Sequence, residues 1–561
     1  MSDRTLGAFV AFGVLLPLAN VSAAHGAQEH PPGDSTAATV ADTLPKRPAP
    51  AGAAPVIDTV LIERSNVFPE GEAENFFQKF LNSAHFMTRP WVIRDELLLK
   101  KGDPYDSALA VETAQVLRER KIFSHVLVDS TRLSDRLALR VRTRDGWSLI
   151  PSVSLKSAGG VTTWRAGLTA INFAGTGNKL HFSYTQGVDR SGFDFALAAP
   201  RFLRSPMRVA GNYSDLSDGR FGNWRVGNPF RSMLDGGRWA YLGSGANRRI
   251  LQFFTTNTSQ DTTFYQERAF INRGVYAFTP IAEKGRFLRV GFSGEVRLQA
   301  YILQPGDTMA VTMVPDTVTG EFSAFLDYRR LRRHTITMFN GFGQEDLDLS
   351  TRLRFSLHVA PSAFGYERTG IGPKLTAKGA VGGKRAFLLA RLQANGLLNS
   401  AGLDSGRVVL HLAFGMKSAK RQSTGLAVHL GMQDSPPPGG QFDLGFQVPL
   451  RAFDPHAFVG TRVAWATFEH RVFAWDSVLG LLGIGFAGFA DYGGAWYEAQ
   501  DPRSGGDVGV GIRIGTSMAS VPRLARLDLA YRFGDGVGDQ RWRVSFGGAF
   551  PFGFFLPLSN R

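Results

Sequence analysis

The clearest pattern in the sequence is the segment Arg352-Leu353-Arg354-Phe355-Ser356-Leu357-His358-Val359, in which polar and apolar side chains alternate strictly. Successive side chains of a β-strand point to opposite faces, so this segment has one apolar face and one polar face. Such a strand can separate lipid from water, as the wall of a transmembrane β-barrel does. The segments Lys179 to Thr185 and Arg289 to Val296 have a similar pattern.

The same kind of pattern fills the chain from Trp147 to Phe552. Polar and apolar residues alternate there in segments of roughly ten residues, and turns rich in Gly, Asp, Asn and Pro separate these segments. About twenty segments resemble strands. We expect a barrel of about 16 strands with long extracellular hairpins, in which the surplus segments extend strands above the membrane. A soluble solenoid or propeller is the main competitor, and the lack of a fixed period of roughly 20 to 50 residues counts against it.

The composition agrees with a β-rich protein of more than one unit. The chain has 561 residues, more than one soluble core usually contains. Only 20% of its residues are charged, whereas 12% are aromatic and 64 are Gly, which favours strands and turns over helices. After the N-terminus there is no apolar run of roughly 18 residues, and the mean hydropathy is -0.09, so a helical membrane protein is excluded.

Charge and cysteine content narrow the function. Lys and Arg outnumber Asp and Glu by 63 to 48, so the net charge is +15 and anionic neighbours are favoured. The basic residues are scattered, which disfavours nucleic acid and leaves lipid headgroups or lipopolysaccharide phosphates as partners. Cysteine is absent, which excludes thiol catalysis, zinc ribbons and disulfide scaffolds.

The N-terminal residues 1–27 are predicted to be an export signal. Arg4 precedes the apolar run Leu6 to Leu18, and Val21-Ser22-Ala23 offers the small residues that a signal peptidase requires. Residues 28–55 are rich in Pro, Ala, Gly and Thr and are predicted to be a disordered linker.

Residues 56–144 are predicted to form one small α+β domain. The expected elements are a strand over Val56 to Ile62, helices over Glu72 to Phe80 and Ser107 to Arg120, and strands over Phe123 to Asp129 and Arg136 to Thr143. This order, with Lys101-Gly102-Asp103-Pro104-Tyr105 before the second helix, resembles the POTRA domain of the BamA/TamA outer-membrane superfamily. In that family POTRA domains offer strand edges to unfolded clients and periplasmic partners. The alternative is a plain α+β spacer.

Residues 145–561 are assigned to the barrel, and their C-terminal part carries the most informative motifs. In order these are Pro449-Leu450-Arg451-Ala452-Phe453, Phe458 to Arg462, Trp465 to Arg471, Gly488 to Trp496, Val508 to Arg513 and Leu527 to Tyr531. Together they resemble the surface-antigen barrel of the same superfamily, whose loop motif is Val/Leu-Arg-Gly-Phe/Tyr.

The resemblance implies a loop that reaches into the barrel lumen. Leu450, Arg451, Ala452 and Phe453 would form its motif, and Arg451 would pair with Asp491 or, as a second choice, with Glu469 on the wall. A guanidinium in a confined lumen requires such carboxylate acceptors. The sequence departs from the family at Ala452, where the family has Gly, so the backbone differs here if that Gly adopts positive φ. The alternative is that the pair only maintains the shape of the barrel.

The resemblance further implies an outer-membrane protein, with its N-terminal domain in the periplasm, that assists insertion or translocation of other proteins. The proposed action in that family uses a weak seam between the first and last strands, here the strand starting near Trp147 and the strand Arg541 to Phe550. No enzymatic activity, cofactor or metal is expected. Two alternatives remain open, namely a passive channel or surface antigen with a POTRA-like anchor, and a hydrolase with a Ser/His/Asp set on the barrel wall.

Overall fold

The fold is described from a computed structural model of the chain. The structure describes residues 55–67, 85–134, 136–146, 148–158, 160–230, 237–255, 260–283, 285–303, 317–342, 344–446, 450–478, 482–516, 524–537 and 540–548. Among these residues, no helix has the length and apolar character needed to cross a bilayer. The expected export signal, nearly all of the expected linker, and the expected helix from Glu72 to Phe80 lie outside the described residues. The chain divides into two compact units, of which the smaller consists of residues 24–150 and 169–180.

The described residues of the smaller unit include a three-stranded sheet and the helices α3 and α4. Its elements are β1 (Ile57–Ser65), α3 (Pro90–Arg94), α4 (Ser107–Glu119), β2 (Phe123–Leu133) and β3 (Arg136–Asp145). The central strand β3 pairs in parallel with β1 and antiparallel with β2. The strands and α4 lie where the sequence predicts them, whereas α3 is a single short helix that the sequence analysis did not predict.

Alternation and helical periodicity explain the core of this unit. Leu139 and Val141 lie on one face of β3 and are fully buried, together with Leu117 of α4 and Ile57 of β1. Burying this apolar face is the main stabilising contribution available to a sheet of three strands.

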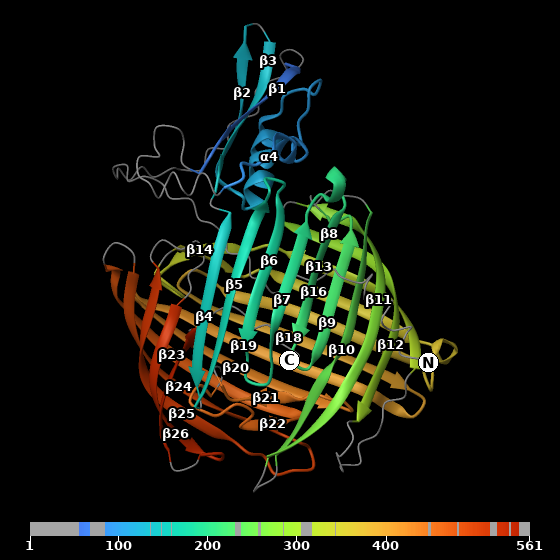
Figure 1. The fold of residues 1–561 in the computed structure, drawn as a ribbon, viewed down its shortest axis with the longest axis vertical. Helices are drawn as coiled ribbons and strands as arrows, with labels where there is room; N and C mark the ends of the chain where they lie inside the picture. The colour runs from blue at the N-terminus through green and yellow to red at the C-terminus, as the bar shows by residue number, and fades with distance from the viewer. Residues whose placement is uncertain are drawn as a thin grey trace. The chain divides into compact units, whose positions relative to one another are not determined.

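The larger unit is a closed antiparallel barrel (Figure 1). Its strands are β4 (Leu149–Ala158), β5 (Val161–Phe173), β6 (Asn178–Gln186), β7 (Ser191–Ala199), β8 (Arg208–Leu216), β9 (Gly219–Gly227), β10 (Arg238–Thr255), β11 (Gln260–Glu283), β12 (Arg286–Leu303), β13 (Thr317–Arg330), β16 (Thr351–Ala360), β17 (Gly370–Gly382), β18 (Ala386–Asn399), β19 (Gly402–Ala419), β20 (Gln422–Asp434), β23 (Arg462–Val478), β24 (Leu482–Trp496), β25 (Gly505–Thr516), β26 (Leu524–Gly534) and β27 (Trp542–Gly548). Two short 3-10 helices, Phe202–Arg204 and Ser362–Phe364, lie in connections.

The barrel has 20 strands, so the expected number of about 16 is wrong. The expectation assigned the surplus segments to extensions above the membrane, whereas the structure pairs them side by side within the wall. A hydrophobic pattern shows where strands lie, but it does not distinguish a new strand from a continuation of its neighbour, because that depends on ladder register.

The segment that alternates most strictly in the sequence is β16. Leu353, Phe355, Leu357 and Val359 are exposed on its outer face, whereas Arg352 turns inward and binds Asp327 of β13. Other strands share this outward apolar face, with Phe292 of β12 and Phe322 of β13 as examples. The outside of the barrel is therefore apolar, as a lipid-facing wall requires.

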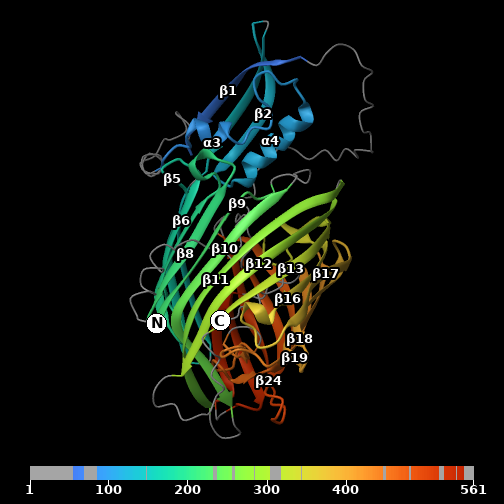
Figure 2. The ribbon, with the colours of Figure 1, turned by 90° about the vertical axis from the view of Figure 1, so that its right-hand side faces the viewer.

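Two ends of the barrel can be defined from the course of the chain (Figure 2). The strands run alternately away from and toward the end at which β4 begins, which we call the near end. The connections 200–207 and 331–350 lie at the near end, and 187–190 and 435–461 lie at the opposite, far end.

Two connections fold into the lumen instead of forming simple turns. The near hairpin, residues 331–350, contains the paired strands β14 (Arg333–Thr337) and β15 (Gln344–Asp348). The far loop, residues 435–461, contains the paired strands β21 (Phe442–Leu444) and β22 (Phe458–Gly460). Both segments pack on inward-facing positions of the wall.

The near hairpin is held by aromatic rings that fit against glycines. A Cβ atom at Gly415 would lie 2.6 Å from the Phe339 ring, and one at Gly483 would lie 2.2 Å from the Phe342 ring. The hydroxyl of Ser423 also donates a hydrogen bond of 2.9 Å to the Phe339 carbonyl. These glycines therefore provide the space that the hairpin occupies.

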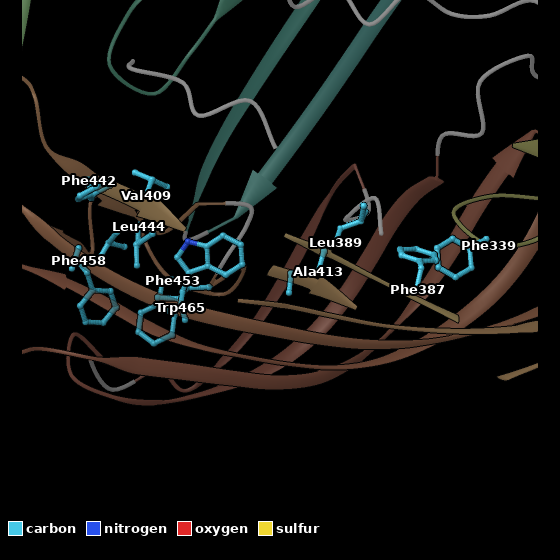
Figure 3. Packing of buried hydrophobic residues seen from close by; sticks show 14 of the residues in the cluster. Phe339, Phe387, Leu389, Val409, Ala413, Phe442, Leu444, Phe453, Phe458 and Trp465 are labelled. Atoms are coloured by element: carbon cyan, nitrogen blue, oxygen red, sulfur yellow. The ribbon is translucent and has the colours of Figure 1, made fainter. Parts of the chain in front are cut away.

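One apolar cluster joins both inserted segments (Figure 3). It includes Phe339 of the near hairpin, Phe387 and Leu389 of β18, and Leu444 and Phe453 of the far loop. This part of the lumen is therefore apolar and not wet. Lumen-facing positions of β18 to β20 are apolar because the inserted segments cover them and exclude water.

The last strand β27 meets the first strand β4 at the seam of the barrel. Among the described residues, β27 and β4 share the single paired position Phe546↔Ser157, whereas β27 pairs with β26 at seven positions from Tyr531↔Trp542 to Ala525↔Gly548. Much of β4 is exposed, including Val153 and Leu155.

Candidate functional site in the barrel lumen

The loop motif lies at the point where the far loop reaches deepest into the lumen. Leu450, Arg451, Ala452 and Phe453 have no exposed surface. Leu450 has a φ of 65°, and the Phe453 amide donates to the Leu450 carbonyl at 3.1 Å, so the backbone reverses there. This tight turn directs the Arg451 side chain toward the wall.

Arg451 makes a two-pronged contact with Asp491 of β24. Its Nε donates to Oδ2 at 2.7 Å and its Nη2 donates to Oδ1 at 3.1 Å. Its Nη1 donates to Glu469 of β23 at 2.9 Å and to Asp528 of β26 at 3.3 Å. The guanidinium lies 4.0 Å from the ring centre of Phe489. One arginine is therefore bonded to carboxylates of three wall strands.

Other arginines complete the charge balance of this cluster. Glu469 also accepts hydrogen bonds from Arg471 at 2.7 Å and Arg513 at 2.9 Å, and Asp528 accepts from Arg513 and Arg526. All these side chains are almost completely buried. Because an unpaired buried charge is costly, the cluster is stable only when its arginines and carboxylates are present together.

Electrostatics keep the loop arginine charged. Burial by itself disfavours the charged guanidinium, but Asp491 and Glu469 outweigh it and hold the pKa of Arg451 above its ordinary value. A permanently charged arginine acts as an anchor and not as a proton donor.

Ala452 fits the loop without the glycine of the family motif. Its φ is not among the positive values of the chain, and the residue that adopts positive φ is Leu450. The Ala452 amide donates to Asp507 at 3.2 Å, and its side chain packs with Phe489 and Ala530. A Cβ at this position is therefore accommodated and buried.

A second anchor holds the far loop on another part of the wall. His456 lies 2.7 Å from Asp443 of β21 and 2.9 Å from Asp189 in the turn between β6 and β7. Its ring also stacks on Phe253 of β10 at 3.9 Å. Burial opposes the charged ring, but the hydrogen bonds to both carboxylates raise the pKa of His456 to about 9.

Polar side chains strengthen the contact between the far loop and β10. The Gln252 amide donates to Gln441 at 2.6 Å and to the Tyr497 hydroxyl at 2.7 Å. The Gly439 amide donates to Gln252 at 2.7 Å. The far loop is thus bonded to β10 on one side and to β23, β24 and β26 on the other, so it crosses the lumen.

The structure places the residues proposed from the sequence together. Arg451 contacts both Asp491 and Glu469, and Asp491 makes the two-pronged contact. The sequence analysis missed Asp528, Arg513 and the other charged members of the cluster. The sequence contains a pattern that could have predicted them. Charged residues two positions apart on an otherwise apolar strand, such as Glu469 and Arg471, point to the same face of the sheet.

A Ser/His/Asp set lies in the smaller unit. His85 Nδ1 lies 3.0 Å from the Ser148 hydroxyl, and His85 Nε2 lies 2.9 Å from Asp145. The same carboxylate oxygen accepts from the Thr88 amide at 2.6 Å. The His85 and Asp145 side chains have no exposed surface, so substrate cannot reach the set and its role is structural.

Comparisons with known proteins find structural neighbours only. No protein-family model matches the sequence, and no curated protein is similar to it. The neighbours include BamA and CdiB. BamA from Haemophilus ducreyi lacking POTRA domains 1–3 has 9% identity and a TM-score of 0.42, over 87% of this chain and 84% of that one.

CdiB from Escherichia coli has 10% identity and a TM-score of 0.44, over 88% and 76% of the two chains. FauA, the alcaligin outer-membrane receptor from Bordetella pertussis, has 13% identity and a TM-score of 0.33, over 76% and 81%. All three TM-scores lie below 0.5. The functional argument therefore rests on the geometry of the chain itself.

Proposed function

We propose that the chain is an outer-membrane β-barrel protein of the BamA/TamA type that assists the insertion or translocation of other proteins. One observation carries this proposal. The seam of the barrel has one paired position among the described residues, Phe546↔Ser157, next to an exposed strand β4. An unpaired strand edge is a template on which an incoming strand can pair.

The far loop supports this function by bracing the wall next to the seam. The buried charge cluster ties it to β23, β24 and β26, and Arg526 of β26 donates to Ser545 of β27 at 3.0 Å. The last described strands are thus held in place beside β4, on whose edge we propose that an incoming strand pairs. We propose no enzymatic role for this arrangement.

The surface of the barrel supports a location in the outer membrane. Apolar side chains cover the outside of the strands, and the net charge of +15 favours lipopolysaccharide phosphates and anionic headgroups. The smaller unit would then be a POTRA-like periplasmic domain. Its sheet order leaves β1 and β2 at the two edges, where clients or periplasmic partners can add a strand.

A passive channel or surface antigen is the second candidate function. The water-accessible lumen positions on β8 to β17 favour it, because they leave part of the interior unfilled. The two inserted segments oppose it, since they occupy the remainder of the lumen. The two functions differ in their requirement for the seam.

A disulfide across the seam tests the proposed function. The chain lacks cysteine, so Ser157→Cys with Phe546→Cys creates one possible bridge, and Cα atoms of paired antiparallel residues lie within disulfide range. The control bridge is Leu529→Cys with Val544→Cys, which joins β26 to β27, strands that are already well paired.

Each variant would replace the natural protein in its host, and the other outer-membrane proteins would be quantified. The seam bridge should lower several of them under oxidising conditions, with recovery after reduction, and the control bridge should not. An unchanged outer-membrane proteome with a formed seam bridge would contradict the proposal and favour the passive candidate.

A further inference from the structure

We propose that one side of the lumen forms a pathway for small anions, from the near-end part of β8 and β9 to the far-end part of β12 and β17. This activity goes beyond the proposed function and does not depend on it. Its basis is a segregation of charge inside the barrel.

Inward-facing positions of β8 to β19 are strongly basic. Ladder register and side-chain alternation place the following basic residues there: Arg208, Arg225, Arg248, Arg273, Arg289, Arg297, Arg329, Arg352, Arg354, Lys374, Lys378, Arg391 and Arg407. Among the side chains that the structure describes, the carboxylates on the same inner face are Glu267, Glu295, Glu321 and Asp327. The charge cluster around Arg451, in contrast, pairs its arginines with carboxylates. The excess positive charge therefore lies on one side of the lumen.

These basic side chains are in contact with water. The side chain of Arg297 is 44% exposed and that of Arg352 is 35% exposed, whereas Arg451 and Arg526 on the other side are at 0%. Arg208, Arg225 and Lys374 are exposed as well. An exposed side chain on the inner face of a closed barrel lies in solvent-accessible lumen.

Two arginines at the near end are close neighbours of like charge. Ala210 pairs with Arg225 and Arg208 pairs with Gly227, so the two guanidinium groups occupy diagonal positions on adjacent strands. Neither forms a hydrogen bond or an ion pair with another described residue in the structure. Like charges on facing strands repel each other, and an anion between them relieves that repulsion.

Among the described residues, the inserted segments are bonded mainly to the other side of the lumen. The near hairpin packs on β17 to β24, through contacts such as Lys378 with Asp348 and Phe342 with Phe473. The far loop is bonded to β10 and to β23 through β26. The basic positions are spread along the barrel axis from one end to the other. Arg225 lies toward the near end, Arg273 at mid-height and Arg297 toward the far end.

A lumen lined by basic side chains selects ions by charge. Rings of Arg and Lys favour anions and exclude cations of similar size, and the confined space strengthens the field. Salt weakens the effect, because the Debye length is about 10 Å at 0.1 M and about 3 Å at 1 M. We therefore expect chloride to pass more readily than potassium, most clearly at low ionic strength.

The test is the reversal potential of the purified full chain in planar lipid bilayers with a KCl gradient. The expected sign is that of chloride permeation. The variant Arg225→Glu with Lys374→Glu should shift the reversal potential toward potassium permeation. The control Arg268→Glu makes the same kind of charge change on the outer face of β11, where the side chain is exposed, and should leave the reversal potential unchanged.

Folding of each variant is checked by heat-modifiable migration in gels before conductance is measured. Potassium selectivity of the natural chain, the absence of any conductance from folded protein, or an unshifted reversal potential in the double variant would each overturn the proposal. None of these outcomes bears on the seam bridge, so failure here and failure of the proposed function are separate results.

Discussion

Replacing Arg451 by alanine should be the most damaging single change in the barrel. The side chain has no exposed surface and donates hydrogen bonds to three carboxylates. After its removal Glu469 keeps Arg471 and Arg513, whereas Asp491 loses its only guanidinium partner among the described residues. The consequence is an uncompensated buried charge at Asp491.

The expected loss of unfolding free energy follows from how many partners each remaining charge keeps. Breaking a buried ion pair by removing one member costs about 3–5 kcal/mol of unfolding free energy, and we expect Arg451→Ala to fall in this range. Asp491→Ala should cost less, about 1.5–3 kcal/mol, because Arg451 retains Glu469 and Asp528. The double variant should cost about as much as Arg451→Ala, which corresponds to a coupling of about 1.5–3 kcal/mol, the whole cost of Asp491→Ala.

The assay is urea-induced unfolding of the purified barrel in detergent micelles, with heat-modifiable migration as an independent readout. Arg329→Ala is the matched control, because Asp327 keeps Arg352 and the lost pair is partly exposed, so its cost should be about 0–1 kcal/mol. Additive losses in the Arg451 and Asp491 double variant would refute the proposed pairing.

Three further outcomes are expected. The pKa of His456 is raised from its ordinary 6.5 to about 9, so its charged form adds to the free energy of unfolding. This contribution is fully present below pH 6.5 and is lost as the pH rises through 9. Between pH 6 and pH 10 the free energy of unfolding of the natural protein should therefore fall by on the order of 2 kcal/mol more than that of His456→Gln. Equal losses in the two proteins would contradict this. Ala452→Gly, which restores the family glycine, should destabilise the barrel by about 0.5–1 kcal/mol in urea unfolding, and a gain in stability would show that the alanine is strained. Gly483→Ala places a Cβ against the Phe342 ring and should loosen the near hairpin by about 1–3 kcal/mol, measured as faster tryptic cleavage within residues 331–350; unchanged cleavage would show that the ring can shift freely.

Alternation along single strands could be predicted from the sequence because it depends only on neighbouring residues. It identified β16 and its apolar outer face. The number of strands depends on which segments pair, and no local pattern reports that.

Only part of the candidate site could be predicted from the sequence. Arg451, Asp491 and Glu469 were proposed together because a family resemblance linked them. Asp528 and Arg513 were missed because their partners are distant in sequence and come together only when the barrel closes. The apolar part of the lumen was missed for the same reason, since Leu389 is inward-facing and appears ill-suited to a wet interior until the near hairpin and far loop cover it.

The joining of both inserted segments into one apolar cluster constrains the order of assembly. The near hairpin belongs to the middle of the chain, whereas the far loop and its charged partners on β23 to β26 come later. Packing both segments on the open sheet, before β27 meets β4, would let their contacts with the wall form without passing through an end of the cylinder. We therefore expect biogenesis to end at the seam, and chains truncated before β23 to accumulate as open, protease-sensitive sheets.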